Sequence, residues 1–327
     1  MVKLSAPAAQ LLRPILDMYM DSAVALVGCH AAGIERGSCE LDVLIVGNES
    51  RPPTSVKMTG VYLDLIFIQD RDALKPENPE HAAAMAHAKH VRDTSLVVST
   101  GSAAGAAVLA DSYRKSTRAR LASALKSLGR VDEAFSQSSI READFWLQAA
   151  AYDYGHALLY SKEVLPAPSH LLGQLKFHSK GTARSFEAFS KGAALEKSSR
   201  NTCGSRLEGI AILHDVLRER REVKAPRLAG WPPAKLEILK AKAEELGSRL
   251  EHAEGYSYLG QEMVQGMLEV ASADDAGKGA VGSLFTGEDK LLSDRLLEEL
   301  GLVRDRPTIE TTLEVMNEQV SSLARKV

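Results

Sequence analysis

The hydrophobic pattern of this chain changes once, close to Gly101 and Ser102. Before that point, short apolar runs rich in Val, Leu and Ile are bounded by turn-forming residues, which is typical of β-strands. These runs are residues 23–27, 41–46 and 61–68. After that point, apolar residues recur every three to four positions, as in amphipathic helices. The sequence therefore predicts an α+β fold, with a small mixed-sheet α/β domain at 1–102 and an all-helical domain at 103–327.

Further elements are expected on both sides of this change. In the first part they are a helix at 5–21, a hairpin strand at 55–58, a helix at 79–90 and a strand at 95–99. In the second part they are helices at 106–128, 132–164, 205–221, 234–250, 256–270, 289–300 and 309–326. The glycine-rich stretch 274–286 has the composition of a mobile surface loop. No strand is expected in the second part.

Composition and charge restrict the possible partners. The chain has 327 residues and a formal net charge of -3, which argues against a surface built as a whole for nucleic acid, so that a nucleic-acid partner is possible but not favoured. Its three cysteines are too few and too scattered for a disulfide framework, which favours a reducing, cytoplasmic location. No signal peptide and no membrane-spanning run is expected, because charged residues and proline interrupt the apolar segments.

Three acidic residues occupy unusual positions in the predicted strands. Glu40 and Asp42 point to the same side of one strand, because side chains alternate along it, and Asp64 interrupts the centre of another. If the strands are neighbours, Asp42 and Asp64 lie about 5 Å apart and repel by roughly 3 kcal/mol at an effective dielectric of about 20. A divalent cation removes that penalty. Oxygen ligands without His or Cys favour Mg²⁺, and two such ions would suit displacement at phosphorus.

A glycine turn precedes the acidic pair. The strand at 23–27 ends in Gly28, followed by Cys29 and a short segment that closes at Gly33. Glycine permits close approach of the backbone, and a helical turn after it directs free N–H groups at an anion. The turn is therefore a candidate phosphate-binding segment next to the predicted metal site.

The stretch ALVGCHAAGIERGSCELDVLIV, together with VYLDLIFI, resembles the polymerase-beta-like nucleotidyltransferase superfamily, especially its minimal and kanamycin nucleotidyltransferase-like members. The resemblance covers roughly the first hundred residues and matches Gly28, Gly33, the acidic pair and the third acid Asp64. Cys29 stands where the family has serine, Ala32 where it usually has arginine, and Glu40 where it has the first aspartate. A helical domain after the α/β domain is the usual arrangement in this family.

The resemblance implies transfer of a nucleoside monophosphate from a nucleoside triphosphate to a hydroxyl acceptor, with release of pyrophosphate. Glu40 and Asp42 would hold two Mg²⁺ ions. Asp64 would ligate the metal nearest the attacking oxygen and act as the base that accepts the proton of the acceptor hydroxyl. Gly28, Cys29 and Gly33 would form the nucleotide-binding segment. A small-molecule acceptor is favoured; the alternatives are nucleotidylation of a protein or RNA end, and a degenerate module that binds nucleotide without turnover.

Other residues admit both a structural and a functional interpretation. Asp64 could pair with a lysine such as Lys57 instead of a metal. His87 and His90 could share a helical face as zinc ligands or be packed. The basic residues of the helical part could form a solvated surface or bind polyanions; they are Lys176, His178, Lys180, Arg184, Lys191, Lys197, Arg200 and Arg206. Aromatic residues of one helix could stack a base or form core; they are Tyr152, Tyr154 and Tyr160.

Overall fold

The computed structural model describes most of the chain. The described residues are 6–35, 37, 39–48, 54–58, 60–74, 78–93, 95–178, 183–220, 233–273, 275–286 and 290–327. Contacts divide the chain into two compact units, Met1–Ser116 with Pro232–Ile238, and Thr117–Trp231 with Leu239–Val327. The functional division predicted at residue 102 stays a prediction.

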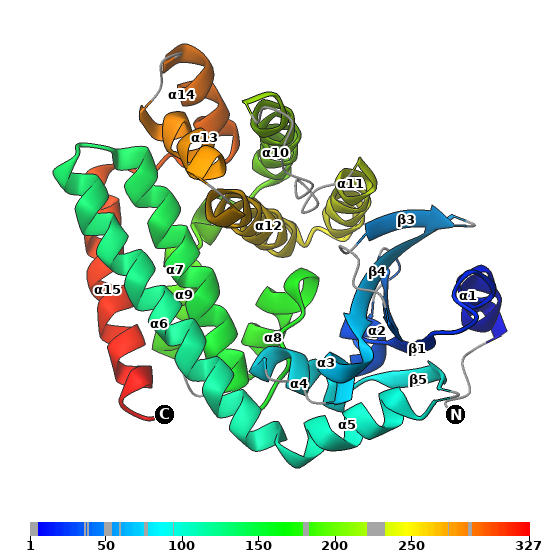
Figure 1. Ribbon diagram of the computed structural model, residues 1–327. Coiled ribbons are helices and arrows are strands. Elements are labelled where there is room, and N and C mark those ends of the chain that lie inside the picture. Colours follow the sequence, from blue (N-terminus) through cyan, green and yellow to red (C-terminus); the bar gives the residue numbers. More distant parts are fainter. Residues whose placement is uncertain are drawn as a thin grey trace. The chain divides into compact units, whose positions relative to one another are not determined.

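The first unit contains a five-stranded mixed sheet in the order β3-β4-β2-β1-β5 (Figure 1). The strands are β1 (Ala23–Leu26), β2 (Leu41–Gly47), β3 (Thr54–Met58), β4 (Val61–Gln69) and β5 (Lys89–Arg92). β2 and β4 are parallel, whereas β1 pairs with β2 and β5, and β3 with β4, in antiparallel fashion. The predicted α+β class with a mixed sheet is confirmed, and the predicted hairpin strand is β3.

Two apolar layers cover this sheet. Helix α1 (Ala6–Met18) places Leu12 and Ile15 on one face, where they pack against Val43, Ile45 and neighbouring strand residues. Helices on the opposite face pack against the alternate side chains of the same strands (Figure 1). These helices are α3 (Asp70–Leu74), α4 (Pro79–Ala86) and α5 (Val97–Ala107). Because Asp42 alternates with Val43, it lies on the second face, near the beginning of β2.

The strand predicted at 95–99 is wrong, because Val97 begins helix α5 and the additional strand is β5. The Val-rich run favours a strand by propensity, but the carboxylate of Asp93 accepts hydrogen bonds from the backbone N–H groups of Val98 at 3.0 Å and Ser99 at 2.7 Å. These are the N–H groups that a first helical turn leaves unsatisfied, so the acid stabilises a helix start here. Context overrides β-propensity at this position.

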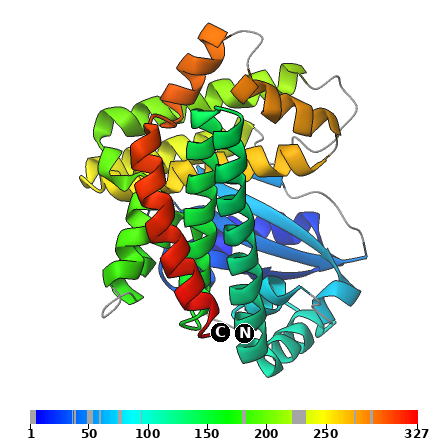
Figure 2. The same ribbon diagram turned by 90° about the vertical axis from the view of Figure 1, so that its left-hand side faces the viewer.

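The second unit is built from helices in its described residues. They are the greater part of α6 (Leu109–Ser136), α7 (Ile140–Tyr160), α8 (Leu171–His178), α9 (Ala183–Gly192), α10 (Arg200–Arg220), most of α11 (Pro233–Ser248), α12 (His252–Ala273), α13 (Asp275–Thr286), α14 (Lys290–Glu299) and α15 (Arg306–Ala324), with 3-10 turns at Pro168–His170 and Leu195–Lys197. Helix α15 packs alongside α7 (Figures 1 and 2).

The glycine-rich stretch predicted as a loop is helix α13, so that prediction is wrong. Three apolar residues at helical spacing, Ala280, Val281 and Leu284, are buried. Glycine in a helix costs about 1 kcal/mol relative to alanine. Burial of one apolar face offsets this cost, which glycine content alone does not reveal.

Helix α7 in the second unit carries a half-buried histidine, His156, that is neutral at ordinary pH. Burial, followed by the charge of Arg120, lowers the pKa of His156 to about 3. The Gln261 side-chain amide nitrogen lies 3.2 Å from its Nε2. A neutral histidine contributes stability that is fully present above its unfolded pKa near 6.5 and is lost as the pH falls toward the folded value.

We therefore expect acid to weaken this unit through His156. Between about pH 7 and pH 5, the free energy of unfolding should fall by about 2 kcal/mol more in the wild type than in His156→Gln, measured by urea unfolding. Equal pH dependence in wild type and His156→Gln would refute this assignment.

Candidate metal and nucleotide site

Two parallel strands bring the three predicted acids together. Asp42 of β2 lies directly opposite Asp64 of β4 in the strand register, and Glu40 precedes β2 by one residue. One carboxylate oxygen from each of the three residues lies within 4.8 Å of the others. Glu40 is buried, with 8% of its surface exposed, whereas Asp42 and Asp64 are half-buried. The structure thus forms the cluster that the alternation of side chains predicts; the roles of its members stay predictions.

The cluster concentrates negative charge in a partly desolvated position, where like charges repel strongly. Two side chains engage Asp64. The hydroxyl of Ser55, opposite it on β3, donates to Oδ1 at 2.6 Å, and the ammonium of Lys235 lies 3.7 Å from Oδ2. Hard carboxylate oxygens at this spacing suit a divalent cation such as Mg²⁺.

Lys57, the alternative partner considered for Asp64, is engaged elsewhere. Its ammonium donates to the hydroxyl of Tyr62 at 3.0 Å and lies 3.5 Å from Oε2 of Glu237. The cation that approaches Asp64 is instead Lys235, which lies far along the chain at the beginning of α11. No local sequence pattern connects Lys235 or Ser55 with Asp64, because only the tertiary fold brings these residues together.

Gly28 lies against Asp42. Its φ of +66° is in the left-handed region, and a Cβ added to it would fall 2.0 Å from Oδ2 of Asp42. Just before it, the backbone N–H of Val27 donates to the carbonyl of Asp42 at 3.0 Å. Both the conformation and the contact require glycine here.

A short helix connects Gly28 to Gly33. Helix α2 spans Gly28–Ala32 and ends at Gly33, whose φ is +72° and whose N–H donates to the carbonyl of Cys29. The ammonium of Lys89 in β5 donates to the carbonyl of His30 at 2.9 Å. The turn is therefore attached to the sheet through β5, close to the acidic cluster.

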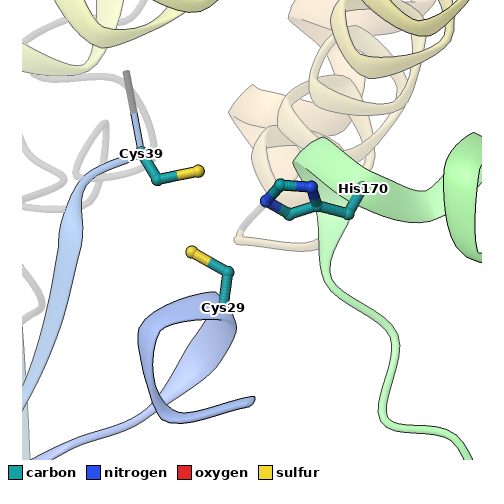
Figure 3. Close-up of side chains that lie close together, drawn as sticks. All are labelled: Cys29, Cys39 and His170. Atoms are coloured by element: carbon teal, nitrogen blue, oxygen red, sulfur yellow. The ribbon is translucent and has the colours of Figure 1, made fainter. Parts of the chain in front are cut away.

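Cys29 and Cys39 lie on either side of the motif and are neighbours in space (Figure 3). Both cysteines are buried and neither is in a disulfide, and their sulfur atoms lie within 4.8 Å of each other. A hydrogen bond with Cys39, followed by burial, raises the pKa of the Cys29 thiol. A raised pKa favours the protonated thiol, which is a poorer nucleophile than the thiolate.

His87 and His90, the two histidines expected to share a helical face, do not lie in one helix. Helix α4 contains His81 and ends at Ala86; His87 follows as its C-cap, and His90 lies in β5. The ring Nε2 of His87 forms a 2.8 Å hydrogen bond with the hydroxyl of Tyr113. The expectation of a shared face for His87 and His90 is therefore wrong, because the helix ends before either of them.

Among the basic residues of the helical part, Arg206 is fully buried. It donates to the carbonyls of Leu300 and Tyr256, both at 2.9 Å, so its role is in the core. Lys191 pairs with Glu187 at 2.8 Å. Lys180 lies outside the described residues. The tyrosines considered for base stacking, Tyr152, Tyr154 and Tyr160, are buried.

Within the described part of the chain, no helix is both long enough and apolar enough to cross a membrane.

No protein-family model and no curated protein matches the chain. Among solved structures, it is similar to a nucleotidyltransferase-like protein from Exiguobacterium sibiricum 255-15, with 10% sequence identity and a TM-score of 0.34 over 88% of this chain and 91% of that one. At this TM-score the similarity supports no inference about activity.

Proposed function

We propose that this chain is a Mg²⁺-dependent nucleotidyltransferase that moves a nucleoside monophosphate from a nucleoside triphosphate to a hydroxyl acceptor and releases pyrophosphate. The observation that supports it is the cluster of Glu40, Asp42 and Asp64, whose carboxylate oxygens lie within 4.8 Å of one another beside a glycine turn. Three carboxylates gathered in one partly desolvated place repel one another, and a bound divalent cation would relieve that repulsion.

Each member of the cluster has a proposed role. Glu40 and Asp42 hold the metal, and Asp64 both contributes a ligand and accepts the proton of the acceptor hydroxyl. Gly28 leaves room for Asp42 and, with Cys29 and Gly33, forms the nucleotide-binding segment. Bound Mg²⁺ would supply neutralisation of the charge that develops on the phosphoryl oxygens.

A small-molecule acceptor is favoured over a polyanionic one. The net charge of the chain is -3. In the basic segment of the helical part, residues 176–206, Arg206 is buried in the core, Lys191 pairs with Glu187 and Lys176 lies near Glu254. Part of that segment's charge is therefore engaged within the protein, which weakens the case for an RNA backbone as the partner. The three free cysteines suit the reducing cytoplasm, where nucleoside triphosphates are abundant.

One observation favours a second candidate, a module that binds nucleotide without turnover. Lys235 and Ser55 both engage Asp64, so the proposed base carries two partners in this structure. Contacts that persist with nucleotide bound would compete with an acceptor hydroxyl for the two oxygens of Asp64.

The test uses purified protein, Mg²⁺, and nucleoside triphosphates labelled at either the α or the γ phosphate, with separated small-molecule and macromolecular fractions of cell extract. Transfer of α label, with γ label recovered in pyrophosphate, supports the proposed transferase, and the labelled fraction identifies the acceptor class. Binding without transfer supports the second candidate. Absence of both binding and transfer contradicts the proposal.

A further inference from the structure

The beginning of helix α11 (Pro233–Ser248) belongs to the first unit, although most of that helix belongs to the second. Two charged side chains hold this segment on the sheet. Oε2 of Glu237 accepts a 3.2 Å hydrogen bond from the hydroxyl of Tyr62, and Lys235 approaches Asp64. Tyr62 and Asp64 are two residues apart on β4 and so point to the same face. The segment therefore lies along the face that carries the acidic cluster.

Lys235 is held in a mostly enclosed position. Only 15% of its side chain and 20% of that of Asp64 are exposed, and the ammonium lies 3.7 Å from Oδ2. The other oxygen of Asp64, Oδ1, accepts the hydrogen bond of Ser55. A cation shared by all three acids must take an oxygen of Asp64, and it would then lie within a few ångströms of the ammonium.

We propose that Lys235 is the built-in counter-ion of the acidic cluster, occupying a cation position beside Asp64 and lowering the affinity of the nucleotide-free protein for divalent metal. This inference rests on the proposed function, because it assumes that the cluster is a metal site. A triphosphate offers the ammonium an alternative anionic partner, so nucleotide and metal bind cooperatively. The lysine thereby keeps the metal-free cluster stable and makes metal entry depend on nucleotide.

The test is titration of the nucleotide-free protein with Mn²⁺, followed by the EPR signal of the free ion. A nearby opposite charge commonly changes a carboxylate's affinity for a proton by about tenfold or more. We therefore expect Lys235→Gln to bind Mn²⁺ at least about tenfold more tightly than the wild type. Lys240→Gln, an equal charge change at an exposed site on the same helix, should bind as the wild type does.

Two further variants distinguish a loss of charge at position 235 from a folding defect, and circular dichroism checks that each variant is folded. Lys235→Met should reproduce the tighter binding, whereas Lys235→Arg, which keeps the charge, should retain the affinity of the wild type. Unchanged or weaker Mn²⁺ binding by folded Lys235→Gln and Lys235→Met, with binding still abolished by Asp42→Asn, overturns the inference and leaves the metal site standing. If neither the wild type nor the neutral variants bind Mn²⁺, the proposed function fails with it.

Discussion

Replacing Asp42 by asparagine is expected to reduce nucleotidyl transfer by about 10³-fold while leaving the fold intact. The register places Asp42 opposite Asp64, and its Oδ2 lies against Gly28, so it occupies the centre of the cluster. Loss of a metal ligand removes several kcal/mol of transition-state stabilisation, and each 1.36 kcal/mol is a factor of ten in rate. The rate of α-phosphate transfer and thermal unfolding by circular dichroism measure the two effects.

In the absence of metal, the Asp42→Asn protein should be at least as stable as the wild type, because one of three repelling carboxylates has lost its charge. Asp72→Asn removes a charge from an ion pair with Arg71 at the surface of the same unit and should leave transfer unchanged. A folded Asp42→Asn variant that keeps the wild-type rate would remove Asp42 from the site.

Replacing Gly28 by alanine is expected to reduce transfer by about 10²-fold, since a displacement of about 1 Å at a reacting group can cost that much. The added Cβ would fall 2.0 Å from Oδ2 of Asp42, so either the carboxylate or the turn must move. The left-handed conformation of Gly28 should in addition cost roughly 1–2 kcal/mol of stability. Steady-state transfer kinetics and urea unfolding separate the two losses.

Gly33 provides a matched control at the other end of α2. Its φ of +72° is close to the +66° of Gly28, but nothing lies within 4 Å of an added Cβ. Gly33→Ala should therefore show a similar loss of stability with much less loss of transfer. Equal losses of transfer in the two variants would mean that the backbone conformation of the turn matters, and not the space beside Asp42.

The first part of the fold follows from local patterns. Alternation of apolar side chains predicts β2 and β4, and it places Asp42 and Asp64 close together on condition that the two strands are neighbours, which the structure shows. The prediction of a strand at 95–99 fails because a side chain outside the run, that of Asp93, stabilises the first turn of α5. The predicted loop at 274–286 fails because glycine content does not show which face of a helix is buried.

The candidate site was predictable only in part. Its acids are separated by short stretches of one sheet, so local pattern places them together. Lys235 reaches Asp64 from a distant segment that folds back on the first unit, and no local pattern connects the two. The same limit applies to Arg206, a basic residue by composition that the tertiary structure places in the core. The order of charged residues in the sequence does not show which of them lie on the surface and which are buried in hydrogen-bonded networks.

The most direct measurement of the central claim is anomalous X-ray diffraction from crystals grown with Mn²⁺ and a non-hydrolysable nucleoside triphosphate analogue. Anomalous density between the carboxylates of Glu40, Asp42 and Asp64, with the triphosphate in contact with that density and with Gly28, is the result predicted. Mn²⁺ and nucleotide bound elsewhere on the protein, with no anomalous density at these three carboxylates, would contradict the account.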